Sequence, residues 1–342
     1  MRPVDNPPNP WLGQHVERLG DPPPARLEVH EEEAKSILTR NDSPDLPFRW
    51  TLNPYRGCFH GCAYCYARPT HQYLGFGAGT DFERRLVVKT NAPELLRREL
   101  QKASWAGERI AFSGVTDCYQ PLEASYELTR RCLAVCAEFR QPVGIVTKGA
   151  LVERDVDLLA ELARHGAATV FVSVPFADEA DARAIEPFAG SPARRLRALA
   201  TLAAAGVPTG VSVSPLIPGL NDHQVPAILQ AAAAAGARHA FHVLLRLPAE
   251  VADVFEARLR AAFPRRADKV LSLLQAMRGG RTNDPRFGAR MVGDGPRWQV
   301  MVDLFASAAR RAGLSPPPRD AAPTPFRRPH RQGSLFGDDA LA

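Results

Sequence analysis

Residues 53–66 read NPYRGCFHGCAYCY and hold three of the chain's six cysteines, Cys58, Cys62 and Cys65. A zinc finger or ribbon usually supplies a second pair of cysteines or histidines about 12–20 residues further on. This sequence has no such pair, and the next cysteine, Cys118, stands alone. A cubane of four irons takes up to four protein thiolates, so three thiolates leave one iron open. The spacing therefore predicts one 4Fe-4S cluster with a free coordination position.

Outward from this loop, short apolar segments alternate with segments of helical periodicity. Strands are predicted at 50–55, 109–114, 143–147, 168–174, 209–213 and 239–245, and helices at 92–103, 123–139, 153–165, 191–205 and 222–235. A further helix is expected at 66–74 and a short strand at 85–89. Such alternation implies parallel strands joined by right-handed crossovers. Six units predict an α/β fold, an open partial (β/α)6 barrel.

Composition divides the chain into four regions. Residues 1–45, rich in proline and charge, are predicted to be an irregular N-terminal arm, and residues 46–250 the partial barrel. Residues 251–314 are a helical C-terminal extension, with helices at 250–262, 267–277 and 298–312, and residues 315–342 a disordered tail rich in proline and arginine.

The composition also bounds location and partners. No apolar run reaches about 18 residues without a charge, which predicts no membrane span. The first residues lack the apolar stretch of a secretion signal. Cysteines clustered in one loop, rather than spread as a disulfide framework, indicate a reducing cytoplasm. The net charge of +6 is compatible with a nucleic-acid partner.

Polar side chains follow the predicted strands at their carboxyl ends. Ser173 lies at the end of one of these strands, and Thr116, Asp117, Lys148 and Arg246 follow the ends of others. In parallel α/β folds, ligands bind at the carboxyl ends of the strands. We therefore expect these side chains to meet at one mouth of the barrel.

The C-x3-C-x2-C spacing, with Tyr64 just before the last cysteine, resembles the radical S-adenosylmethionine (SAM) superfamily. Over residues 46–250 the sequence is similar to the spore-photoproduct-lyase-like branch of this superfamily, through the motifs NPYRGC, R-x-TH-x-YL, TD-x-YQP-x-E and TKG. This resemblance implies that the open iron binds SAM and that one electron cleaves SAM to a 5′-deoxyadenosyl radical. It also implies an electron donor of flavodoxin or ferredoxin type.

The resemblance assigns roles to the residues at the mouth. Thr116 and Asp117 would contact the SAM ammonium, Lys148 its carboxylate, Ser173 its ribose and Tyr64 its adenine. Ordinary alternatives stay open. Thr116 and Asp117 could cap the next helix, Lys148 could be solvated, and Ser173 could be satisfied by backbone.

Cys118 follows Asp117 directly. Spore photoproduct lyase has a hydrogen-donating cysteine a few residues before the Ser/Thr-Asp pair, where this chain has Gly114. Cys118 is therefore a candidate catalytic donor in a displaced position, or a small buried residue. Arg68 and His71 share a helical face and either face substrate or pack.

The tail contains Gln332, Leu335 and Phe336 in the order QGSLF. This resembles the short peptide by which bacterial repair proteins bind the sliding clamp.

The sequence as a whole indicates a radical SAM enzyme whose substrate is unknown, with nucleic acid and a lyase-like DNA repair reaction as the leading hypothesis. The alternative is an iron-sulfur electron-transfer protein, or a metal-bearing nucleic-acid-binding protein, without SAM chemistry.

Overall fold

The computed structural model describes residues 6–13, 26–318 and 323–329. Within them, one seven-stranded sheet has the order β10-β9-β8-β7-β6-β3-β2. Its first six strands in this order run parallel, and β2 pairs antiparallel with β3 at the edge. The strands are β2 (Leu38–Arg40), β3 (Trp50–Leu52), β6 (Ile110–Phe112), β7 (Val143–Thr147), β8 (Ala168–Ser173), β9 (Thr209–Leu216) and β10 (His239–Leu244).

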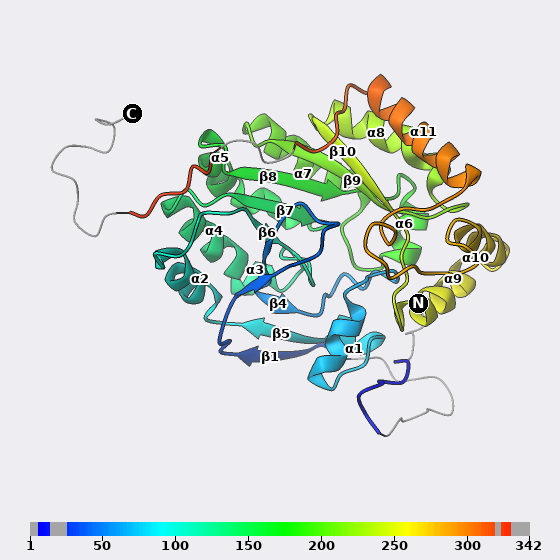
Figure 1. Ribbon diagram of the computed structural model, residues 1–342, viewed down its shortest axis with the longest axis horizontal. Helices are drawn as coiled ribbons and strands as arrows, with labels where there is room; N and C mark the ends of the chain where they lie inside the picture. The colour runs from blue at the N-terminus through cyan, green and yellow to red at the C-terminus, as the bar shows by residue number, and fades with distance from the viewer. Residues whose placement is uncertain (1–5, 14–25, 319–322, 330–342) are drawn as a thin grey trace.

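The predicted α/β fold with six parallel strands is confirmed, and in the described part of the chain the sheet does not close into a barrel. Helices follow the strands and pack side by side along the sheet, with α11 next to α8 beyond the last strand (Figure 1). They are α2 (Ala92–Gln101), α3 (Glu123–Tyr126), α4 (Leu128–Glu138), η2 (Ala150–Asp155), α5 (Val156–Arg164), α6 (Glu179–Ile185), α7 (Pro192–Ala204), η3 (Asp222–Gln224), α8 (Val225–Ala234), α9 (Val251–Ala262), α10 (Ala267–Ala276) and α11 (Pro296–Arg311).

A smaller sheet interrupts the first unit of the predicted barrel. Among the described residues it has three strands, β1 (Glu28–Glu32), β5 (Arg85–Lys89) and β4 (Tyr55–Arg56), in this order. The predicted strand 50–55 is therefore two strands in two sheets, since β3 ends at Leu52 and β4 pairs with β5. The cysteine loop leaves β4 and returns through η1 (Arg68–Leu74) and α1 (Thr80–Arg84).

The predicted irregular arm is wrong for residues 28–40, which contribute β1 and β2. Both strands have mostly exposed side chains, so the alternating apolar pattern that marks a strand is missing. Their partners supply the reason that they form, because β1 pairs with β5 and β2 with β3.

Part of the predicted disordered tail is ordered as well. Ser315 forms a parallel bridge with His239, next to the free edge of β10. The ring of Phe326 stacks on Phe139 with centroids 6.2 Å apart, in contact with Gly107. Arg328 donates to the carbonyl oxygens of Lys102 and Trp105 at 2.7 and 2.8 Å. A few apolar and charged contacts thus order parts of a segment whose composition predicts disorder.

No helix in the described ranges is both long and apolar enough to cross a membrane.

Candidate active site

The three clustered cysteines lie in the connection between β4 and η1, on the side towards which the parallel strands point (Figure 1). Cys58 and Cys62 are buried and Cys65 is partly exposed. Burial raises the pKa of all three thiols, to about 12 for Cys62. Iron binds the thiolate form, so burial opposes binding until the charge of the iron replaces the thiol protons.

Glycines let the loop turn tightly around these thiols. Gly57 has φ +73°, and a Cβ there would lie 2.7 Å from Leu86 and 2.8 Å from the carbonyl oxygen of Phe82. Gly61 has φ +64°. In the described part of the chain, no three His, Cys, Asp or Glu side chains gather as a single metal ion requires. Three thiols in one short loop are nevertheless a donor set of the kind that an iron-sulfur cluster uses.

Arg68 holds the loop from inside. Its guanidinium is fully buried, donates to the carbonyl oxygens of Gly61 and Cys62, and forms an ion pair with Glu83 at 2.5 Å. His71 is buried too, with Nε2 2.7 Å from the carbonyl oxygen of Arg85. Of the two predicted roles for these residues, the structure supports packing.

The residues after β6 connect the sheet to the cysteine loop. The hydroxyl of Thr116 donates to the carbonyl oxygen of Gly57 at 2.6 Å. Gln120 donates to the same carbonyl and accepts from the amide of Phe59 at 2.9 Å. Helix α3 has Leu122 at its N-cap, without a side-chain cap bond, so neither Thr116 nor Asp117 caps that helix.

Asp117 joins β6, β7 and the loop. Its carboxylate accepts from the hydroxyl of Thr147 at 2.6 Å and from the amide of Lys148 at 2.7 Å, and lies 3.4 Å from Nδ1 of His60. Burial raises the pKa of Asp117, but the charge of His60 and these hydrogen bonds outweigh burial and bring the pKa below its usual range. Asp117 therefore stays ionised beside the loop.

Lys148 leaves the end of β7 and extends over the ring of Tyr64, with Nζ 5.5 Å from the ring centroid. Within the described ranges its ammonium has no ion pair. The positive charge lies near the thiols, where it lowers the pKa of Cys62 and Cys65 against the larger effect of burial. The predicted meeting of Lys148 and Asp117 with the cysteine loop is therefore observed, while their contacts with SAM stay a prediction.

Two residues that the sequence prediction missed complete this region, Glu186 and Arg195. Glu186 accepts from the hydroxyl of Tyr64 and forms an ion pair with Arg195 at 2.5 Å. Arg195 donates to the carbonyl oxygen of Ser173 at 3.1 Å. Glu186, Arg195 and Ser173 are all buried, so this network joins the cysteine loop to the end of β8. No local motif marks either residue in the sequence.

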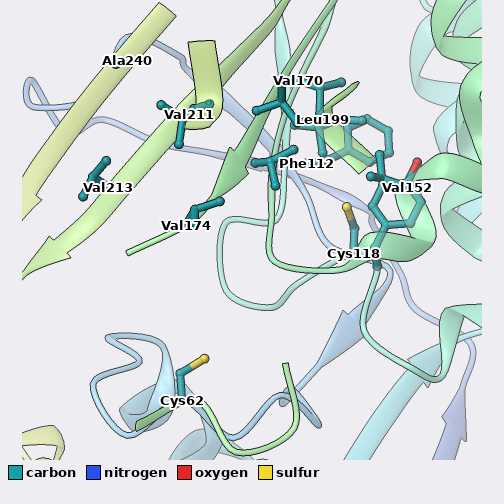
Figure 2. Packing of buried hydrophobic residues seen from close by; sticks show 14 of the residues in the cluster. Cys62, Phe112, Cys118, Val152, Val170, Val174, Leu199, Val211, Val213 and Ala240 are labelled. Carbon is teal, nitrogen blue, oxygen red and sulfur yellow. The ribbon is translucent and has the colours of Figure 1, made fainter. Parts of the chain in front are cut away.

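Cys118 packs in the main core beside Phe112 and Val152, apart from Cys62 (Figure 2). Its side chain is fully buried, and burial raises the pKa of its thiol. These surroundings favour a packing role over that of hydrogen donor. The predicted clamp peptide, Gln332, Leu335 and Phe336, lies outside the described residues and stays a prediction.

Comparison with known proteins gives the family. The model of the Radical SAM superfamily matches residues 52–232. An uncharacterized protein of Mycobacterium tuberculosis is 41% identical over 214 residues, which is 62% of this chain and 63% of that protein. The match thus spans less than two thirds of the relative's length. A protein of Pseudomonas phage M6, described as a radical SAM Nalpha-GlyT isomerase, is 26% identical over 189 residues, covering 54% and 37% of the two chains.

Solved structures show the same fold. Spore photoproduct lyase complexed with dinucleoside spore photoproduct superposes with a TM-score of 0.61 at 16% identity, over 84% of this chain and 81% of that one. A mutant of that lyase with bound S-adenosylmethionine and the dinucleoside gives a TM-score of 0.60 over the same shares. At this identity the likeness concerns the fold alone.

Proposed function

Because the chain belongs to the radical SAM superfamily and is an enzyme of that family, we propose that it cleaves SAM reductively and uses the radical to act on a nucleic acid. The family implies a 4Fe-4S cluster and SAM as cofactors, and Cys58, Cys62 and Cys65 would hold the cluster. When bound, this cluster supplies the electron that splits SAM into methionine and a 5′-deoxyadenosyl radical, which removes a hydrogen atom from a substrate carbon.

One observation carries the proposal. Three cysteines of a single loop, two of them buried, meet polar groups from the ends of β6, β7 and β8, all on one side of the sheet. Asp117 and Lys148 bring opposite charges to this place, as the ammonium and carboxylate of SAM require. Asp117 already accepts bonds from Thr147 and Lys148, so its orientation is fixed before any ligand binds.

The chain's own residues prepare the site. Arg68 and Thr116 fix the backbone of the cysteine loop through its carbonyl oxygens. Glu186 orients Tyr64, and Lys148 over the same ring is positioned to hold the SAM carboxylate. Ser173 is proposed to bond the ribose, because it ends β8 next to this network. The reductant is proposed to be a flavodoxin or ferredoxin.

The substrate class is proposed on weaker grounds. The net charge of +6 and the fold shared with a protein that binds a dinucleoside photoproduct both favour nucleic acid. The name of the phage relative, an isomerase, indicates that related chains need not be lyases.

The experiment compares wild type, Cys62→Ala and Cys132→Ala after anaerobic reconstitution, with dithionite and SAM, and follows 5′-deoxyadenosine by chromatography. Cys132 is a matched control because it is a buried cysteine of α4. Deoxyadenosine is expected from wild type and Cys132→Ala but not from Cys62→Ala. A wild type with bound iron and sulfide that leaves SAM intact would support the electron-transfer alternative, and one zinc per chain would support the nucleic-acid-binding one.

A further inference from the structure

Arg246 follows β10 and carries a guanidinium without an acidic partner among the described residues. Its Nε is buried and has no hydrogen-bond partner, and Nη1 contacts only the thioether of Met291 at 3.9 Å. A guanidinium has five N–H donors in a planar fork and is charged at any physiological pH. Arg246 as a whole is partly buried, and a partly desolvated charge costs stability unless an anion accepts from it.

The position of Arg246 connects it with the cysteine loop. Its guanidinium lies 5.3 Å from the centroid of the Tyr66 ring, and Tyr66 directly follows Cys65. The hydroxyl of Tyr66 donates to the carbonyl oxygen of Gly114 at 2.6 Å, after β6. Arg246 therefore lies over the loop on the β10 side, whereas Lys148 lies over Tyr64 from β7.

A loop between α10 and α11 makes the wall behind Arg246. The amide of Leu244 donates to the carbonyl oxygen of Met291 at 3.2 Å, and Arg278 donates to the carbonyl oxygen of Leu245 at 2.9 Å. Figure 1 shows this orange loop passing the end of β10. The loop thereby places Arg290 close enough for its charge to act on Arg246.

The charges around Arg246 favour an anion. Burial, and next the charge of Arg290, lower the pKa of Arg246, while Tyr66 and Asp45 oppose them. Asp45 is already engaged, because its carboxylate accepts from Arg290 at 2.5 Å and from the amide of Gly288 at 2.6 Å. Because Asp45 already binds Arg290 and Gly288, it does not pair with Arg246, and the positive charge of Arg246 is not balanced by an ion pair.

Exposed aromatic rings accompany the two arginines. Tyr66 is 48% exposed beneath Arg246, and Phe287 is 60% exposed with the guanidinium of Arg290 4.7 Å from its ring centroid. Exposed rings of this kind offer faces on which unpaired bases stack, and arginines beside them bind the phosphates between the bases.

We propose that Arg246 binds a backbone phosphate of a single-stranded nucleic-acid segment, with Tyr66 and Phe287 as stacking faces. This inference deepens the proposed function and rests on it for the reaction that follows binding. The carboxylate of SAM is the other anion of the proposed reaction, and it is assigned to Lys148, whose Nζ lies over the ring of Tyr64.

The experiment measures the binding of a fluorescein-labelled oligothymidylate by anisotropy over a series of salt concentrations. Arg246→Gln is compared with Arg281→Gln, which removes the same charge from an exposed position in the loop between α10 and α11. Arg246→Gln should weaken binding about 10- to 100-fold, because a charged hydrogen bond to phosphate is lost. It should also reduce the slope of log K against log salt by about 0.7, the value for one phosphate of a single strand. Arg281→Gln should change the affinity less than about threefold.

Two further measurements separate binding from structure and from SAM. Arg246→Gln should raise the melting temperature of the ligand-free protein by about 2 °C, because an unpaired and partly buried charge is removed. The binding of SAM to the same variant is measured without oligonucleotide. A lower melting temperature would make Arg246 structural, loss of SAM binding would assign it to the SAM carboxylate, and oligonucleotide affinity within threefold of wild type would remove the phosphate role. Each of these results overturns the proposal.

The two proposals fail in different ways. If wild type binds the oligonucleotide through Arg246 but forms no deoxyadenosine, the proposed function falls and the phosphate site stands. If deoxyadenosine forms but wild type does not bind the oligonucleotide, the phosphate site falls and the radical chemistry stands.

Discussion

The ion pair of Glu186 and Arg195 is predicted to be the main support of the aromatic residue between Cys62 and Cys65. Both side chains are at most 1% exposed, and Glu186 also accepts from the hydroxyl of Tyr64. Glu186→Gln keeps the shape but leaves the charge of Arg195 buried and unpaired. Breaking a buried pair in this way costs about 3–5 kcal/mol of the free energy of unfolding.

The double variant Glu186→Gln/Arg195→Met removes both charges at similar volume. Replacing a whole buried pair is often close to neutral, so we expect the double variant to lie within about 2 kcal/mol of wild type and above either single variant. The assay is urea unfolding of the cluster-free protein, followed by circular dichroism. Glu179→Gln, which breaks an exposed pair with Arg183, is the control and should change the free energy of unfolding by less than about 0.5 kcal/mol.

A result in which the two single variants add up to the double variant would refute this reasoning, because it would mean that the charges do not compensate one another. So would a loss below about 1 kcal/mol for Glu186→Gln, a value typical of exposed pairs.

Four further predictions concern residues elsewhere in the chain. Burial lowers the pKa of His242 to about 4, below its ordinary 6.5, so the folded state binds this proton less readily than the unfolded state. The free energy of unfolding should therefore fall by about 3 kcal/mol from this residue as pH falls from 6.5 to 4. In His242→Phe, unfolding measured across the same pH range should lack this contribution. Arg68→Lys cannot serve the carbonyl oxygens that the guanidinium binds, so the iron content after reconstitution should fall severalfold while Arg183→Lys stays at the wild-type value. Cys118→Ala should keep the deoxyadenosine yield of wild type, and a lost yield with a normal cluster spectrum would argue against its packing role. Phe326→Ala loses the stack on Phe139, about 1 kcal/mol, and limited trypsin digestion should cut after Arg327 faster than in wild type.

The parallel strands could be predicted because each is a short run of buried apolar residues, and β7 has the predicted bounds. The predicted helix 123–139 is two helices, since Glu127 takes φ +52° between α3 and α4. A non-glycine residue in this conformation leaves no mark in the apolar pattern, because burial of Glu123 and its hydrogen bonds decide it. Helix α6 was not predicted, because its seven residues are too few for a periodic signal.

The site residues also divide into those that the sequence could predict and those that it could not. The cysteines were predictable because a cluster needs thiolates at short, fixed spacing, and Asp117 and Lys148 because strand ends converge in a parallel sheet. Glu186 lies 122 residues from Tyr64, and their contact depends on how α6 and α7 pack. Sequence positions alone hold no information on such a pairing.

The cationic side chains of this site divide into those that form ion pairs and hold the structure and those without ion pairs, which can bind a ligand. Arg68 and Arg195 are the most deeply buried cations near the loop, and both are balanced, by Glu83 and Glu186. Since their charges are satisfied inside the protein, they can hold backbone and rings but have little left to bind a ligand. Lys148 and Arg246 are the opposite case.

Each of these two cations lies over a tyrosine on one side of Cys65, Lys148 over Tyr64 and Arg246 over Tyr66, and neither forms an ion pair with an acidic side chain of the described residues. Desolvating a charge without balancing it costs stability, and this cost is recovered when an anion binds. We therefore expect two anions to bind at this end of the sheet. The proposed reaction includes two, the carboxylate of SAM and a phosphate of the nucleic acid that carries the reacting carbon.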